Sequence, residues 1–150
     1  MDSYSGNIIK LYDDYISWSN ELLGSFGGVQ MFAQLFTGGA EYTKREEHSA
    51  FFSACGEAAG AYLAALGEGE APREELMPLL SYVLIRCHSG GDDWAEWMLL
   101  AAEKHFLPFI ELLTKEEAAE LYEPYRKLRR RNKGLPPQDE MLKKLKIKRK

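Results

Sequence analysis

The sequence predicts an all-α fold, an irregular antiparallel bundle of about five to seven helices that ends in a basic C-terminal helical arm. Apolar residues recur at helical intervals along nearly the whole chain, and no stretch shows the sustained two-residue alternation of a half-buried strand. Glycines and prolines separate these amphipathic segments. With 150 residues, of which 45% are hydrophobic, the chain is long enough to bury a core without disulfides or metals.

Glycines mark the predicted end of the first helix and both ends of the second. One runs from Tyr4 or Asn7 to Leu23 and ends at Gly24, with its large apolar residues on one face. A short second helix is expected from about Val29 to Phe36, because paired glycines bound this apolar stretch on both sides.

A capping box predicts the start of the third helix. The Thr43 side chain can accept a hydrogen bond from the Glu46 amide, and the Glu46 side chain can reach back, so the helix should run from here to about Leu66. Gly56 and Gly60 lie one turn apart within it, although glycine costs a helix about 1 kcal/mol relative to alanine. We therefore expect a neighbouring backbone to pack closely there; the alternative is a groove for a ligand or partner helix.

The fourth helix is predicted from Pro72 to Cys87 or His88, and Pro78 either kinks it or marks its true beginning. Its end, with a thiol beside an imidazole, is the best case in the chain for nucleophilic catalysis. Neighbouring residues on a helix point about 100° apart, however, so these two side chains would not face each other. We interpret the segment as the end of one helix and the start of the next, and the sequence predicts no catalytic residue.

The fifth and sixth helices each begin at a polar cap and contain a proline. The Asp92–Asp93 pair caps the fifth, which Pro108 breaks or bends. Thr114 and Glu117 form another capping box, which opens a helix with Pro124 inside it. The apolar stripe of the fifth helix comprises Trp94, Trp97, Met98, Ala101 and His105.

The charge is divided between an acidic body, residues 1–125, and a basic arm, residues 126–150. The body has 7 Lys and Arg against 21 Asp and Glu, and the arm has 12 cations against 2 carboxylates, so the net charges are −14 and +10. Gly134, Pro136 and Pro137 are expected to form a hinge into the final short helix of the arm. An overall charge of −4 therefore conceals two regions of opposite sign.

Three interpretations of the arm remain open. It could contact nucleic acid or a nucleoprotein, since its cations recur at helical intervals and Tyr122 and Tyr125 lie one turn away. It could dock on the acidic body of its own chain or of a second copy, held mainly by Leu142 and Leu145, or it could be a solvated end. We prefer the first, with a membrane surface as a minor variant. The predicted contact residues are Arg126, Lys127, Arg129, Arg130, Arg131, Lys133, Lys143 and Lys144.

An alternative function uses the acidic body instead. A compact helical protein with clustered carboxylates can imitate nucleic acid and occupy a basic channel on another protein, as small inhibitors from phages and mobile elements do. This hypothesis requires a contiguous acidic face. In that case the arm would dock on the body or on a second subunit of a homodimer.

Enzymatic, metal and cofactor motifs are missing from the sequence. His48 and His105 lack the Glu-x-x-His spacing of a di-iron bundle, and no glycine-rich phosphate loop follows a strand. Cys55 and Cys87 suit buried free thiols better than a disulfide or zinc framework. We therefore expect a non-enzymatic protein without cofactor or metal, without a membrane span, and located in the cytoplasm.

Overall fold

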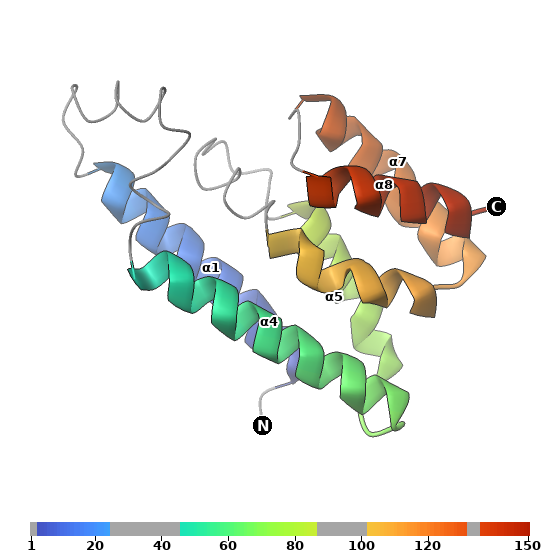
Figure 1. Ribbon diagram of the computed structural model, residues 1–150, viewed down its shortest axis with the longest axis horizontal. Coiled ribbons are helices and arrows are strands. Elements are labelled where there is room, and N and C mark those ends of the chain that lie inside the picture. Colours follow the sequence, from blue (N-terminus) through green and yellow to red (C-terminus); the bar gives the residue numbers. More distant parts are fainter. Residues whose placement is uncertain (1–2, 25–45, 87–101, 132–135) are drawn as a thin grey trace.

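All the secondary structure described in the computed structural model is helical. The model describes residues 3–24, 46–86, 102–131 and 136–150, and none of the elements in these ranges is a strand (Figure 1). The predicted all-α class is confirmed. Several predictions lie outside the described residues: the helix at 29–36, the Thr43 cap, the cap at Asp92 or Asp93, the Trp94–Ala101 part of the fifth stripe, and Gly134 of the hinge.

Helices α1 (Tyr4–Gly24) and α4 (Glu46–Gly67) lie side by side and run in opposite directions (Figure 1). Aromatic side chains fill the interface between them. The ring of Phe51 lies 4.4 Å from that of Tyr15 and 5.3 Å from that of Tyr12, measured between ring centroids. Because aromatic pairs bury large areas, this cluster supplies much of the contact that holds the two longest helices together.

The close backbone approach predicted at the two glycines of α4 is wrong for the described residues. A Cβ added at Gly60 would meet nothing within 4 Å, and one added at Gly56 would lie 3.0 Å from the imidazole of His105. Gly56 therefore makes room for a side chain, and Gly60 faces open space. The spacing of the two glycines alone could not distinguish a half-buried side-chain contact from a backbone contact.

Helix α5 (Leu76–Leu84) follows a single 3-10 turn, η1 (Arg73–Glu75). Pro78 is its third residue, so it marks the beginning of the helix, where the first turn has no acceptor for its amides. The helix ends three residues before the predicted end at Cys87, because Ile85 leaves the helical region with φ of −127°. One side of α5 is fully apolar, and its buried residues are Leu76, Leu79, Leu80, Val83 and Leu84.

Arg73, in the turn before α5, forms an ion pair with Glu117 in the first turn of α7 (Lys115–Arg131). Its guanidinium donates to both carboxylate oxygens of Glu117, at 3.0 and 2.5 Å, and to the carbonyl of Leu112 at 2.9 Å. These hydrogen bonds from Arg73 lower the pKa of Glu117 to about 2, with a further contribution from the backbone N–H of Thr114. The pair joins segments 44 residues apart in the chain.

The Arg73–Glu117 pair predicts a specific acid sensitivity. Because the pKa of Glu117 is lower in the folded protein than its unfolded value near 4.3, the pair stabilises the fold above that pH. This stability should disappear as the pH falls from about 4.5 to 2. After allowance for solvent screening, Arg73→Met should remove about 1 kcal/mol of the pH-dependent stability, measured by urea unfolding at several pH values. Lys115→Met is the control, and equal pH dependence in both variants would contradict the assignment.

Element η3 (Ala102–Leu112) is a 3-10 helix that continues through Pro108. The sequence predicted that Pro108 breaks or bends the helix, and of these two effects the break is wrong. Phe106 and Phe109 on either side of it are fully buried, so the core holds the segment helical across the proline, whose own side chain is exposed. Eleven residues is long for a 3-10 helix.

Helices α7 and α8 (Pro136–Lys148) form a C-terminal hairpin that packs against η3. The predicted capping box opens α7: the Glu117 amide donates to Thr114 Oγ1 at 3.1 Å, and the Thr114 amide donates to Glu117 Oε1 at 2.8 Å. Pro136 and Pro137 belong to the first turn of α8 rather than to a hinge before it. One apolar core runs from α1 to α8.

Candidate nucleic-acid interface

Helix α8 is attached to the protein by its apolar side. Met141 and Leu145, one turn apart, are both 0% exposed, and Leu142 beside them is half-buried. They pack in the angle between α7 and η3, which lie next to α8 in Figure 1. Burying two such side chains is worth about 1.5 to 3 kcal/mol each, which is enough to order a short helix. This apolar contact also fixes which side of α8 faces solvent.

Polar contacts supplement the apolar ones at the end of α8. Lys148 donates to the carbonyl of Glu111 at 3.1 Å, and the Lys144 Nζ lies 3.5 Å from the Glu111 carboxylate. The guanidinium of Arg149 lies 4.0 Å from the centre of the Tyr122 ring. Each exposed ion pair contributes about 0 to 1 kcal/mol, so burial of the apolar residues dominates the attachment.

Three lysines lie on the opposite side of α8 and directly after its end, and we call them the α8 ridge: Lys143, Lys146 and Lys150. All three side chains are exposed. Lys143 and Lys146 lie three residues apart on one face of the helix, and Lys150 follows in the turn after the last helical residue, Lys148. Within the described parts of the chain, none of them forms an ion pair. Glu140 is the exposed carboxylate nearest to them along the helix. Three positive charges are thus presented to solvent over roughly 10 Å at the end of α8.

The predicted contact residues fall into three groups. Lys127 and Lys143 are exposed, as a phosphate contact requires. Arg126 donates to Glu123 at 2.9 Å, and this bond lowers the pKa of the Glu123 carboxyl; Lys144 is half-buried beside Glu111. The remaining four have side chains outside the described residues, and they are Arg129, Arg130, Arg131 and Lys133.

The two tyrosines one turn away from the basic residues of α7 are buried. Tyr122 is 6% exposed beneath Arg149, and Tyr125 is 1% exposed. The Tyr125 hydroxyl donates to the buried carboxylate of Glu103 at 2.5 Å and so joins α7 to η3. Their spacing from the basic residues on α7 favoured a nucleic-acid contact in the sequence, but both tyrosines lie on the side of α7 that faces the core.

Sequence reasoning missed two lysines of the ridge. Lys146 and Lys150 were counted in the charge of the arm but were not assigned to the site. The spacing of Lys146 from Lys143 carried a signal, because residues three positions apart share a helix face. Lys150 lies past the end of α8, so helical spacing gave no signal for it. The rotation of α8 about its own axis decides which lysines point outward. That rotation is fixed because Met141 and Leu145 are buried in the core.

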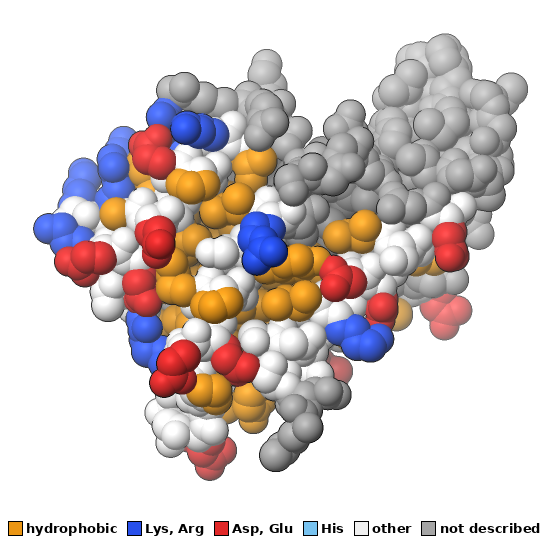
Figure 2. Space-filling model, turned by 180° about the vertical axis from the view of Figure 1, so that it is seen from behind, with side chains coloured by type: hydrophobic (Ala, Val, Ile, Leu, Met, Phe, Trp, Pro, Cys, Tyr) orange, Lys and Arg blue, Asp and Glu red, His pale blue; other side chains and the backbone are white. Residues whose placement is uncertain are grey.

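Lysines and arginines gather at one end of the molecule in Figure 2, on the side where α7 and α8 lie in Figure 1. Carboxylates are interspersed among them. Over the rest of this face the acidic side chains are interrupted by apolar, uncharged and basic ones. The view in Figure 2 therefore does not present the contiguous acidic surface that the alternative function requires.

Cys55 and His105 are two further candidate residues whose side chains the structure describes. Cys55 is fully buried, and burial raises the pKa of its thiol to about 12, so it is an inert core residue. His105 is half-buried against Gly56, and burial lowers its pKa. The described residues contain no group of His, Cys, Asp or Glu side chains that could hold a metal ion. Cys87 and His88 lie outside the described residues.

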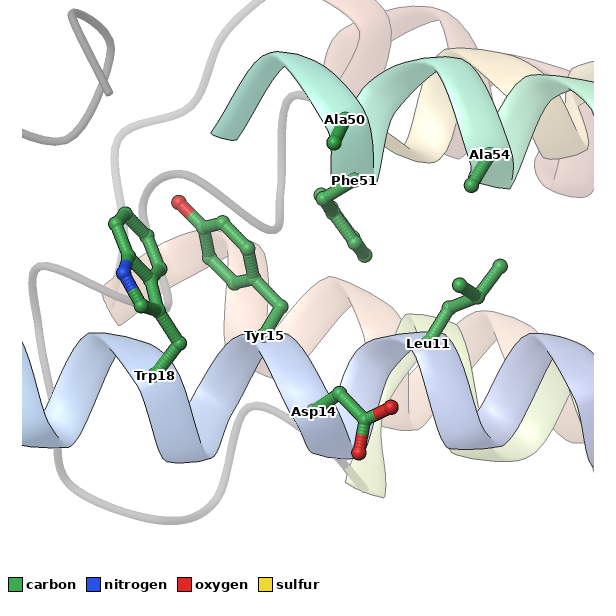
Figure 3. A pocket seen from close by; sticks show the side chains of 7 residues that line it. All are labelled: Leu11, Asp14, Tyr15, Trp18, Ala50, Phe51 and Ala54. Atoms are coloured by element: carbon green, nitrogen blue, oxygen red, sulfur yellow. The ribbon is translucent and has the colours of Figure 1, made fainter. Parts of the chain in front are cut away.

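An apolar pocket of about 330 Å³ lies between α1 and α4 (Figure 3). Tyr15, Trp18 and Phe51 form its aromatic wall, and Ala50 leaves space above them. The carboxylate of Asp14, at the edge, is paired with Lys10 at 2.7 Å. The pocket therefore has no unpaired charge aimed into it that would define a ligand.

Comparison with known proteins gives no relative for this chain: no family model, no curated protein and no solved structure matches it. No helix among the described segments is long and apolar enough to cross a lipid bilayer.

Proposed function

We propose that this protein is a non-enzymatic helical module that binds the phosphate backbone of nucleic acid through the α8 ridge, with Lys127 of α7 as an additional contact. A single observation supports the proposal most strongly. The apolar side of α8 is fixed in the core, so Lys143 and Lys146 are held on its exposed face, and Lys150 is exposed just past the end of the helix. None of the three has an ion pair to another described residue. Lysines arranged in this way gain by contacting phosphates, because binding releases condensed counterions.

The geometry favours contacts that do not depend on base sequence. Phosphate contacts position a protein on nucleic acid but carry no sequence information. Tyr122 and Tyr125 are unavailable for stacking because they are buried in the core. The acidic body would repel the same polyanion, so only the end that carries α8 would approach it.

A salt titration tests this function. For wild-type protein, the association constant for a fluorescent duplex should fall as the salt concentration rises. If the three ridge lysines each neutralise one phosphate, the plot of log K against log salt concentration should have a slope of about −2.7 or steeper. That slope corresponds to a roughly 40-fold loss between 50 and 200 mM salt. Replacing Lys143, Lys146 and Lys150 together by Gln should flatten the slope by a similar amount, measured by fluorescence anisotropy.

The matched control removes the same charge elsewhere. Lys10, Lys104 and Lys115 are exposed residues of α1, η3 and α7, and their combined replacement by Gln should leave the slope within experimental error of the wild type. Absence of binding at 50 mM salt, or equal loss in both triple variants, would refute the proposal.

The same variants distinguish the proposed nucleic-acid binding from the alternative function, an inhibitor that uses the acidic body. Deleting the whole arm would remove Met141 and Leu145 from the core and so damage the fold. Substitutions confined to the ridge avoid this problem, since their side chains are exposed. Capture of a basic protein partner that survives the ridge substitutions, together with absence of nucleic-acid binding, would favour the alternative.

A further inference from the structure

Ile147 is an apolar side chain in the middle of the basic ridge. It is 61% exposed, compared with 40% for Leu112 and 36% for Tyr4, the other exposed large hydrophobic residues described. Lys143 lies one turn before it on the same side of α8, and Lys150 follows three residues after it, just past the end of the helix at Lys148. The backbone N–H of Lys150 donates to the Ile147 carbonyl at 3.3 Å, which keeps the last lysine close to the isoleucine.

Ile147 has no role in holding α8 in place. Met141 and Leu145 make the inward contact, and Ile147 projects away from them, so its side chain does not reach the core. A single exposed isoleucine is ordinary on a protein surface. Here, however, any polyanion that places phosphates on Lys143 and Lys150 must also cover Ile147, because it lies between them.

Duplex and single-stranded nucleic acid differ in what they would place there. A duplex presents phosphates and sugars on its outside and keeps its base faces stacked within the helix. A single strand can turn an unstacked base outward and lay its face against a protein side chain. Burial of the apolar surface of Ile147 therefore favours a single strand.

Resting on the proposed function, we propose that the α8 ridge binds single-stranded nucleic acid in preference to duplex, with one base lying against Ile147 and the flanking phosphates on Lys143 and Lys150. The contact is apolar and independent of base identity, since every base has a flat face to offer. The phosphates supply most of the affinity, and Ile147 supplies the preference for unpaired strands.

Substitutions at Ile147 test this preference with three probes: a single-stranded DNA 12-mer, the same strand with abasic sites throughout, and its duplex. Wild-type protein should bind the 12-mer more tightly than either of the others. Ile147→Trp should tighten binding of the 12-mer roughly threefold to tenfold, because an aromatic ring stacks on a base more strongly, and should change the other two by less than twofold. Ile147→Gln should weaken binding of the 12-mer alone. The exposed position makes both variants safe for folding, which circular dichroism would verify.

Each outcome has a distinct meaning. If Ile147→Trp tightens all three probes equally, or none of them, the base contact is refuted while phosphate binding through the ridge stands. If the ridge-lysine variants bind every probe as the wild type does, or no probe binds at 50 mM salt, the proposed function itself fails.

Discussion

Leu145→Ala is expected to lower the free energy of unfolding by about 3 kcal/mol. The Leu145 side chain is 0% exposed and joins α8 to the core that runs through η3 and α7. Truncation would remove its burial and leave a cavity, and leucine-to-alanine changes at such sites cost about 2 to 5 kcal/mol. In a chain of this length the loss corresponds to a fall in Tm of roughly 6 to 12 °C.

Ile147→Ala is the matched control for Leu145→Ala. It removes the same kind of side chain from the same helix, two residues further on, but from the exposed face. Its effect on unfolding should stay within about 0.5 kcal/mol. Equal and small effects of the two substitutions, in chemical or thermal denaturation, would mean that α8 does not dock on the body.

Phe109→Ala should destabilise the protein more strongly, by about 3 to 5 kcal/mol. The Phe109 ring lies 5.7 Å from the ring of Tyr62 on α4 and 5.9 Å from that of Phe106, measured between centroids. It is fully buried one residue after Pro108, where the 3-10 winding of η3 holds it against the core. The substitution would therefore loosen the contact between the N-terminal helix pair and the C-terminal hairpin.

Leu112→Ala serves as the control on the same 3-10 helix. Leu112 is 40% exposed, so its truncation should cost less than about 1 kcal/mol. Urea unfolding of the two variants measures the difference. A Phe109→Ala variant as stable as Leu112→Ala would contradict the placement of η3 in the core.

Local signals in the sequence predicted much of the fold. The Thr114–Glu117 capping box has the predicted hydrogen bonds, because the side chains that form it lie within one turn of each other. Features that depend on tertiary packing were predicted less well. Pro108 reads as a helix break, but the burial of the phenylalanines on either side maintains a 3-10 helix through it. Likewise, the one-turn spacing of Gly56 and Gly60 did not show that Gly56 lies against the His105 side chain while Gly60 faces open space.

At the candidate site, too, the features that depend on tertiary packing could not be predicted from the sequence. Sequence reasoning identified the basic arm and the importance of Leu145, since both follow from composition and helical period. It could not determine the orientation of α8, so it did not show that Arg149 covers Tyr122 or that Ile147 is exposed. The rotation of a short amphipathic helix about its axis depends on residues far away in the chain, here those of η3 and α7.

The central claim is that nucleic acid contacts the outer face of α8. Titrating ¹⁵N-labelled protein with a single-stranded oligonucleotide at 50 mM salt, and following the backbone amides by NMR, tests it most directly. We predict that the shifts concentrate at residues 143–150 and around Lys127, and that they disappear when the three ridge lysines are replaced by Gln. Shifts confined to α1 and α4, or no shifts at all, would contradict the account.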